Sequence, residues 1–333
     1  GGGGWRVAVE GRAEETLLIT GVRLGKSYGN QRVLGDLDFQ IEAGERVALL
    51  GLNGAGKTTL FRCLLALTDF EGELRVAGET VTPGRKEVRR KIGYVPQQAP
   101  LYDMTLAEFV AFFSALRGVS MEGPASTLAE LGMSLEETGA KALNELSGGM
   151  VQKALLGLAL GSGSPVLLLD EPTANLDPGA RRDLFRRVRD IAAETTLLFA
   201  SHRLDEIELL ADRVLVLHGG RLAFDGTLEE LWQATDAAPR LWLSAPAHEV
   251  ERLAAALREC PVVSDLRANG AGVEVDVRGD ASLDLLLEVR QRGLPVTDFR
   301  TRPPSLEHVL DRLEAHDASL VEADASPVGR GEG

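Results

Sequence analysis

The residues with the most specific chemistry read Gly51-Leu52-Asn53-Gly54-Ala55-Gly56-Lys57-Thr58. Glycines at this spacing let backbone N–H groups turn inward around phosphate oxygens. A lysine can reach the terminal phosphates, and a threonine hydroxyl is a suitable ligand for Mg²⁺. An ordinary glycine-rich turn would not need the Lys-Thr pair. The segment therefore predicts a phosphate site formed by Gly51, Asn53, Gly54, Ala55, Gly56, Lys57, Thr58 and Thr59.

Two carboxylates follow the apolar run 166–169, which predicts a buried strand. Ligands bind beyond the carboxyl ends of strands in open α/β sheets, so Asp170 and Glu171 are candidates for chemistry. Asp170 could hold a metal directly or through water, and Glu171 could act as general base on an attacking water. By itself such a pair is more often a helix N-cap. A phosphate loop in the same chain favours the catalytic interpretation.

The pattern around these residues predicts the elements that position them. A strand at 47–50 precedes the glycines, and a helix at 58–67 follows them. Further strands at 92–95, 166–169, 196–200 and 214–217 alternate with helices. This alternation is typical of an α/β fold with a parallel sheet and right-handed crossovers. Short antiparallel strands are expected within 16–44, and helices between 106 and 139 form an inserted subdomain.

A third segment, Leu146-Ser147-Gly148-Gly149-Met150, lies directly before a predicted helix. At this point the chain resembles the ATP-binding-cassette (ABC) ATPases, whose signature is LSGGQ. Methionine replaces the glutamine here, as in many cassettes of bacterial export systems. The resemblance covers residues 17–235 and implies a P-loop NTPase cassette: a parallel-sheet core, an antiparallel edge sheet and an inserted helical subdomain.

The resemblance also implies roles for isolated residues. Tyr28 would stack on adenine, Gln97 would sense the metal and γ-phosphate, and His202 would contact the γ-phosphate. Each of these residues also has an ordinary structural interpretation. Tyr28 could be an aromatic residue of a strand, Gln97 a turn residue and His202 a loop residue. Asp177 ends a segment similar to the family's D-loop. The implied cofactors are ATP and Mg²⁺, with catalysis by Glu171, His202 and Gln97 and with Mg²⁺ at Thr58, Gln97 and Asp170.

The expected partners follow from the same resemblance. Ser147, Gly148 and Gly149 start a helix, whose free N–H groups can bind a γ-phosphate. In the family that phosphate belongs to a second cassette, so we expect a homodimer that sandwiches two ATP molecules. No run reaches the ~18–20 apolar residues that span a bilayer, so a separate membrane permease is expected. Segment 101–105 would be the part of the chain that contacts this permease.

The remaining length predicts further parts. Residues 1–15 are expected to be a disordered or artificial N-terminus, and 16–235 are the ATP-binding domain, with a helical subdomain at about 98–160. Residues 241–313 have the β-α-β-β-α-β order of a ferredoxin-like domain, so this second domain is expected to be of the α+β class. Residues 314–333 form a disordered acidic tail. Within 304–310, PSLEHVL resembles the PSLEDVF ending of ABC-2-type exporter ATPases.

Composition excludes other classes. The 333 residues include 36 Lys+Arg and 50 Asp+Glu, a formal net charge of −14. Nucleic acid is therefore not expected as a partner. The start of the sequence is not a signal peptide, and Cys63 and Cys260 are too far apart in the sequence for a metal motif. Both features favour a cytoplasmic protein, which its permease would hold peripherally at the inner membrane face. The alternatives are an importer ATPase, or a non-transport ABC ATPase of DNA repair or translation.

Overall fold

A computed structural model of the chain describes residues 16–98, 102–173, 176, 178–192, 195–235, 240–277, 281–302, 309–310 and 312–313. The predicted N-terminal segment 1–15 and acidic tail 314–333 lie outside the described residues. So do Leu101, Asn175 and Asp177, and most of the PSLEHVL segment. The chain divides into two compact units, one ending at Thr227 and the other beginning at Leu228.

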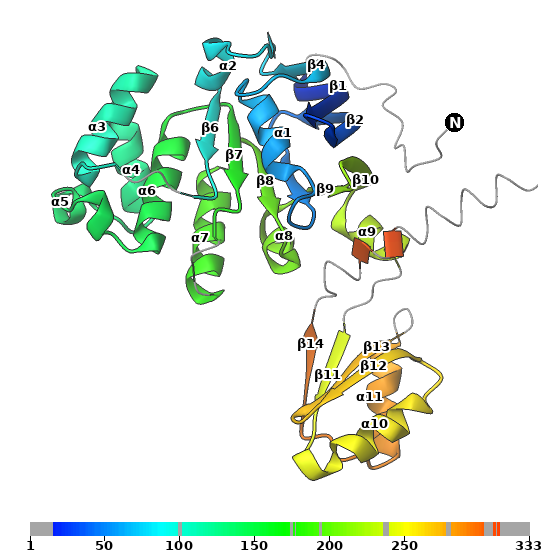
Figure 1. Cartoon of the computed structure of the whole chain (residues 1–333). Helices are drawn as coiled ribbons and strands as arrows, with labels where there is room; N and C mark the ends of the chain where they lie inside the picture. The colour runs from blue at the N-terminus through cyan, green and yellow to red at the C-terminus, as the bar shows by residue number, and fades with distance from the viewer. Residues whose placement is uncertain are drawn as a thin grey trace, which may run out of the picture. The chain divides into compact units, whose positions relative to one another are not determined.

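The first unit begins with a four-stranded antiparallel sheet of order β2-β1-β4-β5 (Figure 1). The long strands β1 and β2 are joined by a tight turn at Gly29, which has a φ of 56°. Alternate residues of β2, such as Leu37, Phe39 and Ile41, are buried. The expected short strands are thus parts of a longer hairpin. The sheet consists of β1 (Leu17–Tyr28), β2 (Gln31–Glu42), β4 (Glu71–Val76) and β5 (Glu79–Thr80).

The central sheet has the order β10-β9-β3-β8-β7-β6. Five neighbouring strands pair in parallel as predicted, whereas β10 pairs antiparallel with β9 at the edge. Every residue of β7 and β8 is buried, which explains their continuous apolar runs. The strands are β3 (Arg46–Leu50), β6 (Ile92–Val95), β7 (Val166–Asp170), β8 (Thr196–Ser201), β9 (Arg213–His218) and β10 (Arg221–Gly226).

Helix α1 (Lys57–Leu64) follows β3 and ends three residues before the predicted Leu67. The reason is that Ala66 adopts a positive φ of 54°, which a right-handed helix cannot accommodate. Helices α7 (Pro178–Ile191) and α8 (Leu204–Leu210) follow β7 and β8. Each helix therefore begins beyond the carboxyl end of a parallel strand, where the candidate site residues lie.

The predicted helical insertion is present beside the edge strand β6, and α6 packs against that strand (Figure 1). Helix α3 begins with a capping box between Thr105 and Glu108 and ends at Gly118, whose φ is 70°. Helix α6 begins at Gly148, and the side chain of Ser147 caps it. The helices of the insertion are α3 (Leu106–Arg117), α4 (Glu122–Glu130), α5 (Leu135–Thr138), η2 (Leu143–Glu145) and α6 (Gly148–Gly161), whereas the short helix α2 (Lys86–Arg90) precedes β6.

The second unit contains a four-stranded antiparallel sheet of order β12-β13-β11-β14. Together with two helices this gives the predicted β-α-β-β-α-β order, with a core that includes Leu243, Leu253 and Val275. Strand β14 begins at Asp298, after a local turn in which the Val296 N–H bonds to the Leu294 carbonyl. The elements are α9 (Leu228–Thr235), β11 (Arg240–Ser244), η3 (Ala247–Glu249), α10 (Val250–Arg258), β12 (Val263–Asn269), β13 (Gly272–Val277), α11 (Ser282–Gln291) and β14 (Asp298–Arg302).

Beyond β14, residues 309, 310, 312 and 313 are described, and these are helical. Within the part of the chain that the structure describes, no helix has both the length and the apolarity needed to cross a membrane.

Candidate functional site

The phosphate loop, residues 51–58, connects β3 to α1 in a conformation that requires glycine. Gly56 caps the helix with a φ of 110°, and a Cβ there would lie 2.7 Å from Leu34 Cδ2. A Cβ on Gly51 would lie 2.5 Å from the Leu217 carbonyl oxygen. The loop is therefore packed directly against β2 and β9. This close packing is what holds its backbone in place for a ligand.

Lys57 is buried at the start of α1, with 6% of its surface exposed. Its Nζ donates to the carbonyl oxygens of Gly51 at 2.7 Å and Leu52 at 3.3 Å. The same atom lies 3.4 Å from Glu171 Oε1. The ammonium is thus held inside the loop, and these contacts compensate for its burial.

Thr58 and Asp170 meet across the site, with the Thr58 hydroxyl donating to Asp170 Oδ2 at 2.8 Å. Burial raises the pKa of the Asp170 carboxyl, while the hydrogen bond from Thr58 opposes that shift. A hydroxyl and a buried carboxylate are both hard oxygen ligands of the kind that Mg²⁺ prefers. The donor set therefore fits the predicted metal.

Glu171 lies at the centre of the cluster, with both carboxylate oxygens engaged. Gln97 Nε2 donates to Oε2 at 3.0 Å, and His202 Nδ1 lies 3.4 Å from Oε1. The backbone of Glu171 has a φ of 47°, an uncommon conformation for a residue with a side chain. Its N–H bonds to the Ala200 carbonyl at 3.1 Å, which holds this turn beside β8. Such strain is typical of functional sites.

The structure thus brings six predicted residues together from separate segments. The phosphate loop supplies the cation and a hydroxyl, the end of β7 supplies two carboxylates, and the ends of β6 and β8 supply an amide and an imidazole. Apart from two pairs of sequence neighbours, the six residues are distant in the sequence, and their meeting results from the parallel order of β6, β7, β8 and β3. The six are Lys57, Thr58, Gln97, Asp170, Glu171 and His202.

The signature residues have different surroundings. Ser147 caps α6 and accepts a hydrogen bond from the Met150 N–H at 3.3 Å. Ser147 and Gly148 are exposed, and a Cβ on Gly149 would lie 2.8 Å from Leu176. Their contacts are within α6 and with Leu176, rather than with the carboxylate of Glu171. The N-terminus of α6 is therefore presented to solvent.

Tyr28 is 44% exposed at the end of β1. Its ring centroid lies 4.6 Å from Lys26 Nζ, and that ammonium is paired with Asp69 at 2.7 Å. Lys26 belongs to no motif and was missed by sequence reasoning. A signal was present, because residues two apart in a strand point to the same face. Asp177 is outside the described residues, so its predicted place stays a prediction.

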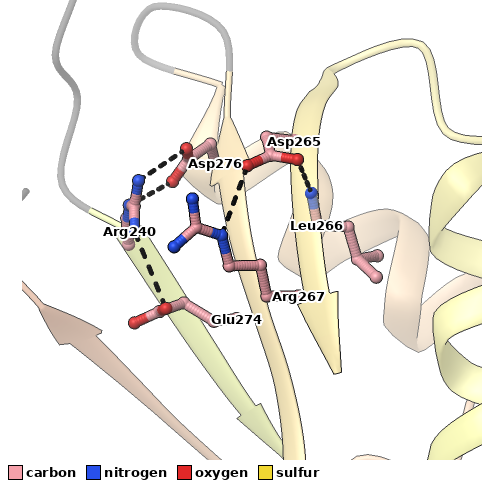
Figure 2. Close-up of a pocket in the computed structure, with 6 residues that line it drawn as sticks. All are labelled: Arg240, Asp265, Leu266, Arg267, Glu274 and Asp276. Atoms are coloured by element: carbon pink, nitrogen blue, oxygen red, sulfur yellow. Dashed lines mark hydrogen bonds and ion pairs between the residues drawn. The ribbon is translucent and has the colours of Figure 1, made fainter. Parts of the chain in front are cut away.

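A second charged cluster lines a shallow pocket on the C-terminal sheet. Figure 2 shows Arg240 of β11 between Asp276 and Glu274 of β13. Its Nε lies 2.6 Å from Asp276 Oδ1, and its Nη1 lies 3.7 Å from Glu274 Oε2. Arg267 is paired with Asp265 at 3.7 Å. Both arginines are matched by carboxylates, and the described residues contain no group of three or more His, Cys, Asp or Glu able to hold a metal. The pairs of Arg240 join β11 to β13, whereas Arg267 and Asp265 both belong to β12.

Comparisons with known proteins show the family to which the chain belongs. The ABC transporter family profile matches residues 34–174. An ABC transporter ATP-binding protein of Bacillus subtilis is 34% identical over 86% of this chain and 96% of its own length. The chain belongs to the ABC transporter ATP-binding proteins. As a member of that family it binds ATP and hydrolyses it as the ATPase subunit of an ABC transporter.

Other relatives cover nearly the whole chain. The Nod factor export ATP-binding protein I of Burkholderia orbicola is 33% identical over 86% of this chain and 94% of its own. The daunorubicin resistance ATP-binding protein of Streptomyces coeruleorubidus is 31% identical over 93% and 99%. A solved ATP-binding subunit of an ABC transporter matches with a TM-score of 0.59 and 31% identity, covering 65% of this chain and 92% of that one.

Proposed function

We propose that this ABC ATPase subunit hydrolyses MgATP with Glu171 as general base, and that it drives export through a separate permease. The observation that carries the proposal is the position of the Glu171 carboxylate between Lys57, Gln97 and His202. A carboxylate held at this point by three side chains is fixed for proton abstraction from water.

Each neighbouring side chain has a task in this proposal. Lys57 would exchange its contacts with Gly51 and Glu171 for the β- and γ-phosphates. Thr58, Asp170 and the amide oxygen of Gln97 would hold Mg²⁺, which neutralises charge on the phosphate oxygens when bound. His202 would contact the γ-phosphate from the side of β8. Tyr28 would stack on the adenine, because its ring is exposed and supported by Lys26.

The second half of the active site would come from another copy. The exposed Ser147 and the free N–H groups that begin α6 are suited to a γ-phosphate, since a helix N-terminus attracts anions. We infer a homodimer in which each signature segment, Ser147 to Gly149, together with Asp177 closes the partner's ATP site. ATP would hold the two copies together, and hydrolysis would release them.

Export is favoured over import by the relatives. One is a Nod factor export protein and another a daunorubicin resistance protein, and both align over most of this chain. We infer that the chain works in the cytoplasm, held peripherally at the inner membrane face by its permease. A neighbouring gene for a membrane-spanning permease without a binding protein would support export. A neighbouring periplasmic binding protein would contradict it.

Two substitutions test the site roles. Lys57→Ala should weaken ATP binding at least about tenfold, because a phosphate ligand is lost. Glu171→Gln should leave the dissociation constant of ATP within about twofold of the parent value. It should lower the turnover number by a factor of about 10²–10⁴, the usual contribution of a general base. Fluorescent nucleotide titration and phosphate release measure the two effects. Glu137→Gln, at an exposed position of α5, is the matched control.

The same Glu171→Gln variant tests the dimer. Sedimentation with MgATP should show a dimer, and sedimentation without nucleotide should show a smaller species. A monomer under both conditions would overturn the shared-site proposal. Equal loss of ATP binding in Lys57→Ala and Glu171→Gln would overturn the assignment of Glu171 as general base.

A further inference from the structure

A buried carboxylate outside the phosphate site has no role in the mechanism above. Glu206 on α8 is 2% exposed, yet both of its oxygens are occupied. The Thr173 hydroxyl donates to Oε1 at 2.5 Å, and the Ser201 hydroxyl donates to Oε2 at 2.7 Å. Glu206 therefore joins two strand ends that lie far apart in the sequence.

Two arginines compensate the charge of Glu206. Arg181 Nε of α7 lies 3.2 Å from Oε1, and Arg203 Nε lies 3.5 Å from the same oxygen. Arg181 also donates to the Leu176 carbonyl at 3.0 Å. A buried charge without partners costs several kcal/mol, and these groups supply the partners that the Glu206 carboxylate needs. The network spans the segment after β7, the start of α7, the end of β8 and α8.

The two hydroxyls lie beside the proposed catalytic residues. Thr173 follows Glu171 by two positions, and Ser201 immediately precedes His202. Glu171 and His202 also meet directly, at 3.4 Å between Oε1 and Nδ1. The backbone adds a third link, from the Glu171 N–H to the Ala200 carbonyl. The segments that carry the base and the histidine are thus joined by their side chains, by their backbone and through Glu206.

We propose that Glu206 is a positioning residue that fixes Glu171 relative to His202 by holding Thr173 and Ser201 together. This inference rests on the proposed function, because it assigns Glu206 a task for those two residues. Glu206 acts on them through the two hydroxyls. Its effect is on geometry, and a misplacement of about 1 Å at a reacting group can cost 10²-fold in rate.

The first experiment compares Glu206→Gln with Glu208→Gln, which removes the same charge from an exposed position of α8. In Glu206→Gln the turnover number should fall about 10–100-fold, while the dissociation constant of ATP stays within about twofold, since the phosphate loop is untouched. Glu208→Gln should retain the turnover number. Parallel loss of turnover and of ATP affinity, or normal turnover in Glu206→Gln, would overturn the inference.

Smaller changes keep the test valid if Glu206→Gln fails to fold. Thr173→Val and Ser201→Ala each remove one hydroxyl that donates to Glu206. If both act through the same bridge, the double variant should lose little more turnover than the worse single variant. Multiplied effects would show that the hydroxyls act separately and would contradict the inference.

Glu171→Gln, assayed in parallel, separates the two proposals. If it turns over ATP normally, the proposed function fails whatever Glu206→Gln does. If Glu171→Gln is inactive and Glu206→Gln is fully active, the inference alone fails.

Discussion

The Thr58 hydroxyl donates a 2.8 Å hydrogen bond to Asp170, a residue 112 positions further along the chain. This bond joins the first turn of α1 to the end of β7. It occupies the two oxygen ligands proposed for Mg²⁺ and holds them close together. The fold therefore holds these two proposed ligands side by side, which lowers the entropic cost of ordering them when a metal binds.

Asp170→Asn should stabilise the nucleotide-free protein. Burial raises the folded-state pKa of Asp170, so the ionised form is disfavoured on folding. A carboxyl group whose pKa is raised by folding stabilises the protein at pH values below its pKa in the unfolded state, about 3.9. That stability is lost as pH rises through its pKa in the folded state. At pH 7 the asparagine variant should melt about 2–4 °C higher, the shift that ~1 kcal/mol gives in a domain of this size.

The gain from Asp170→Asn should disappear at pH 3, where the aspartic acid of the parent is protonated and therefore as neutral as the asparagine of the variant. Scanning calorimetry at pH 3 and pH 7 makes the comparison. The variant should also lose the extra stabilisation that MgATP gives the parent protein. A lower melting temperature of the nucleotide-free variant at pH 7 would show that burial is not the dominant influence on Asp170.

Gly56→Ala should disrupt the phosphate loop more than Gly54→Ala. Both glycines have positive φ, 110° and 86°, so both alanines strain the backbone. Only at Gly56 would the Cβ also lie within 2.7 Å of Leu34. The expected loss is about 1–2 kcal/mol for Gly54→Ala and about 1–3 kcal/mol more for Gly56→Ala. Urea unfolding measures both, and equal losses would contradict the steric contribution of Leu34.

Asp212→Asn should destabilise the fold only above acidic pH. Arg46 donates two side-chain hydrogen bonds to Asp212, at 2.9 and 2.7 Å, and these lower the pKa of the carboxyl. The stability they give is present above the unfolded pKa of about 3.9 and is lost as pH falls through the folded value. Asp212 is 47% exposed, so solvent screening limits the loss to about 0.5–1 kcal/mol at pH 7.

Urea unfolding at pH 7 and pH 3 checks this dependence. Asp103→Asn removes an exposed carboxylate and serves as the control. A loss for Asp212→Asn that is equal at both values of pH would mean that packing, rather than charge, holds this pair.

Both cysteines should resist alkylation in the folded protein. Cys63 is fully buried, and burial raises the pKa of its thiol to about 11. Burial also raises the pKa of Cys260, which is 2% exposed. The reactive thiolate is therefore scarce and inaccessible at pH 8. Mass spectrometry after maleimide treatment should find both thiols unmodified in buffer and labelled in guanidinium. Leu67→Cys, at a position that is 59% exposed, should react in buffer.

Much of the cassette fold could be predicted from local patterns. The buried strands β7 and β8 are continuous apolar runs, and Ser147 indicates the start of α6 by its capping chemistry. Predictions were wrong where backbone conformation overrode side-chain pattern, as at Ala66, which ends α1 early. The antiparallel pairing of β10 depends on a hairpin at the sheet edge, which apolar periodicity does not report.

Residue type and spacing alone identify the groups suited to phosphate, metal and acid–base chemistry, because they fix that capacity. The meeting of Lys57, Gln97 and His202 at Glu171 depends on the fold, since the order of parallel strands brings their ends together. Glu206 has no distinguishing pattern in the sequence, where it is one acid among several on a short helix. Its importance comes from burial between two strand ends, where a charge must find partners and therefore holds them together.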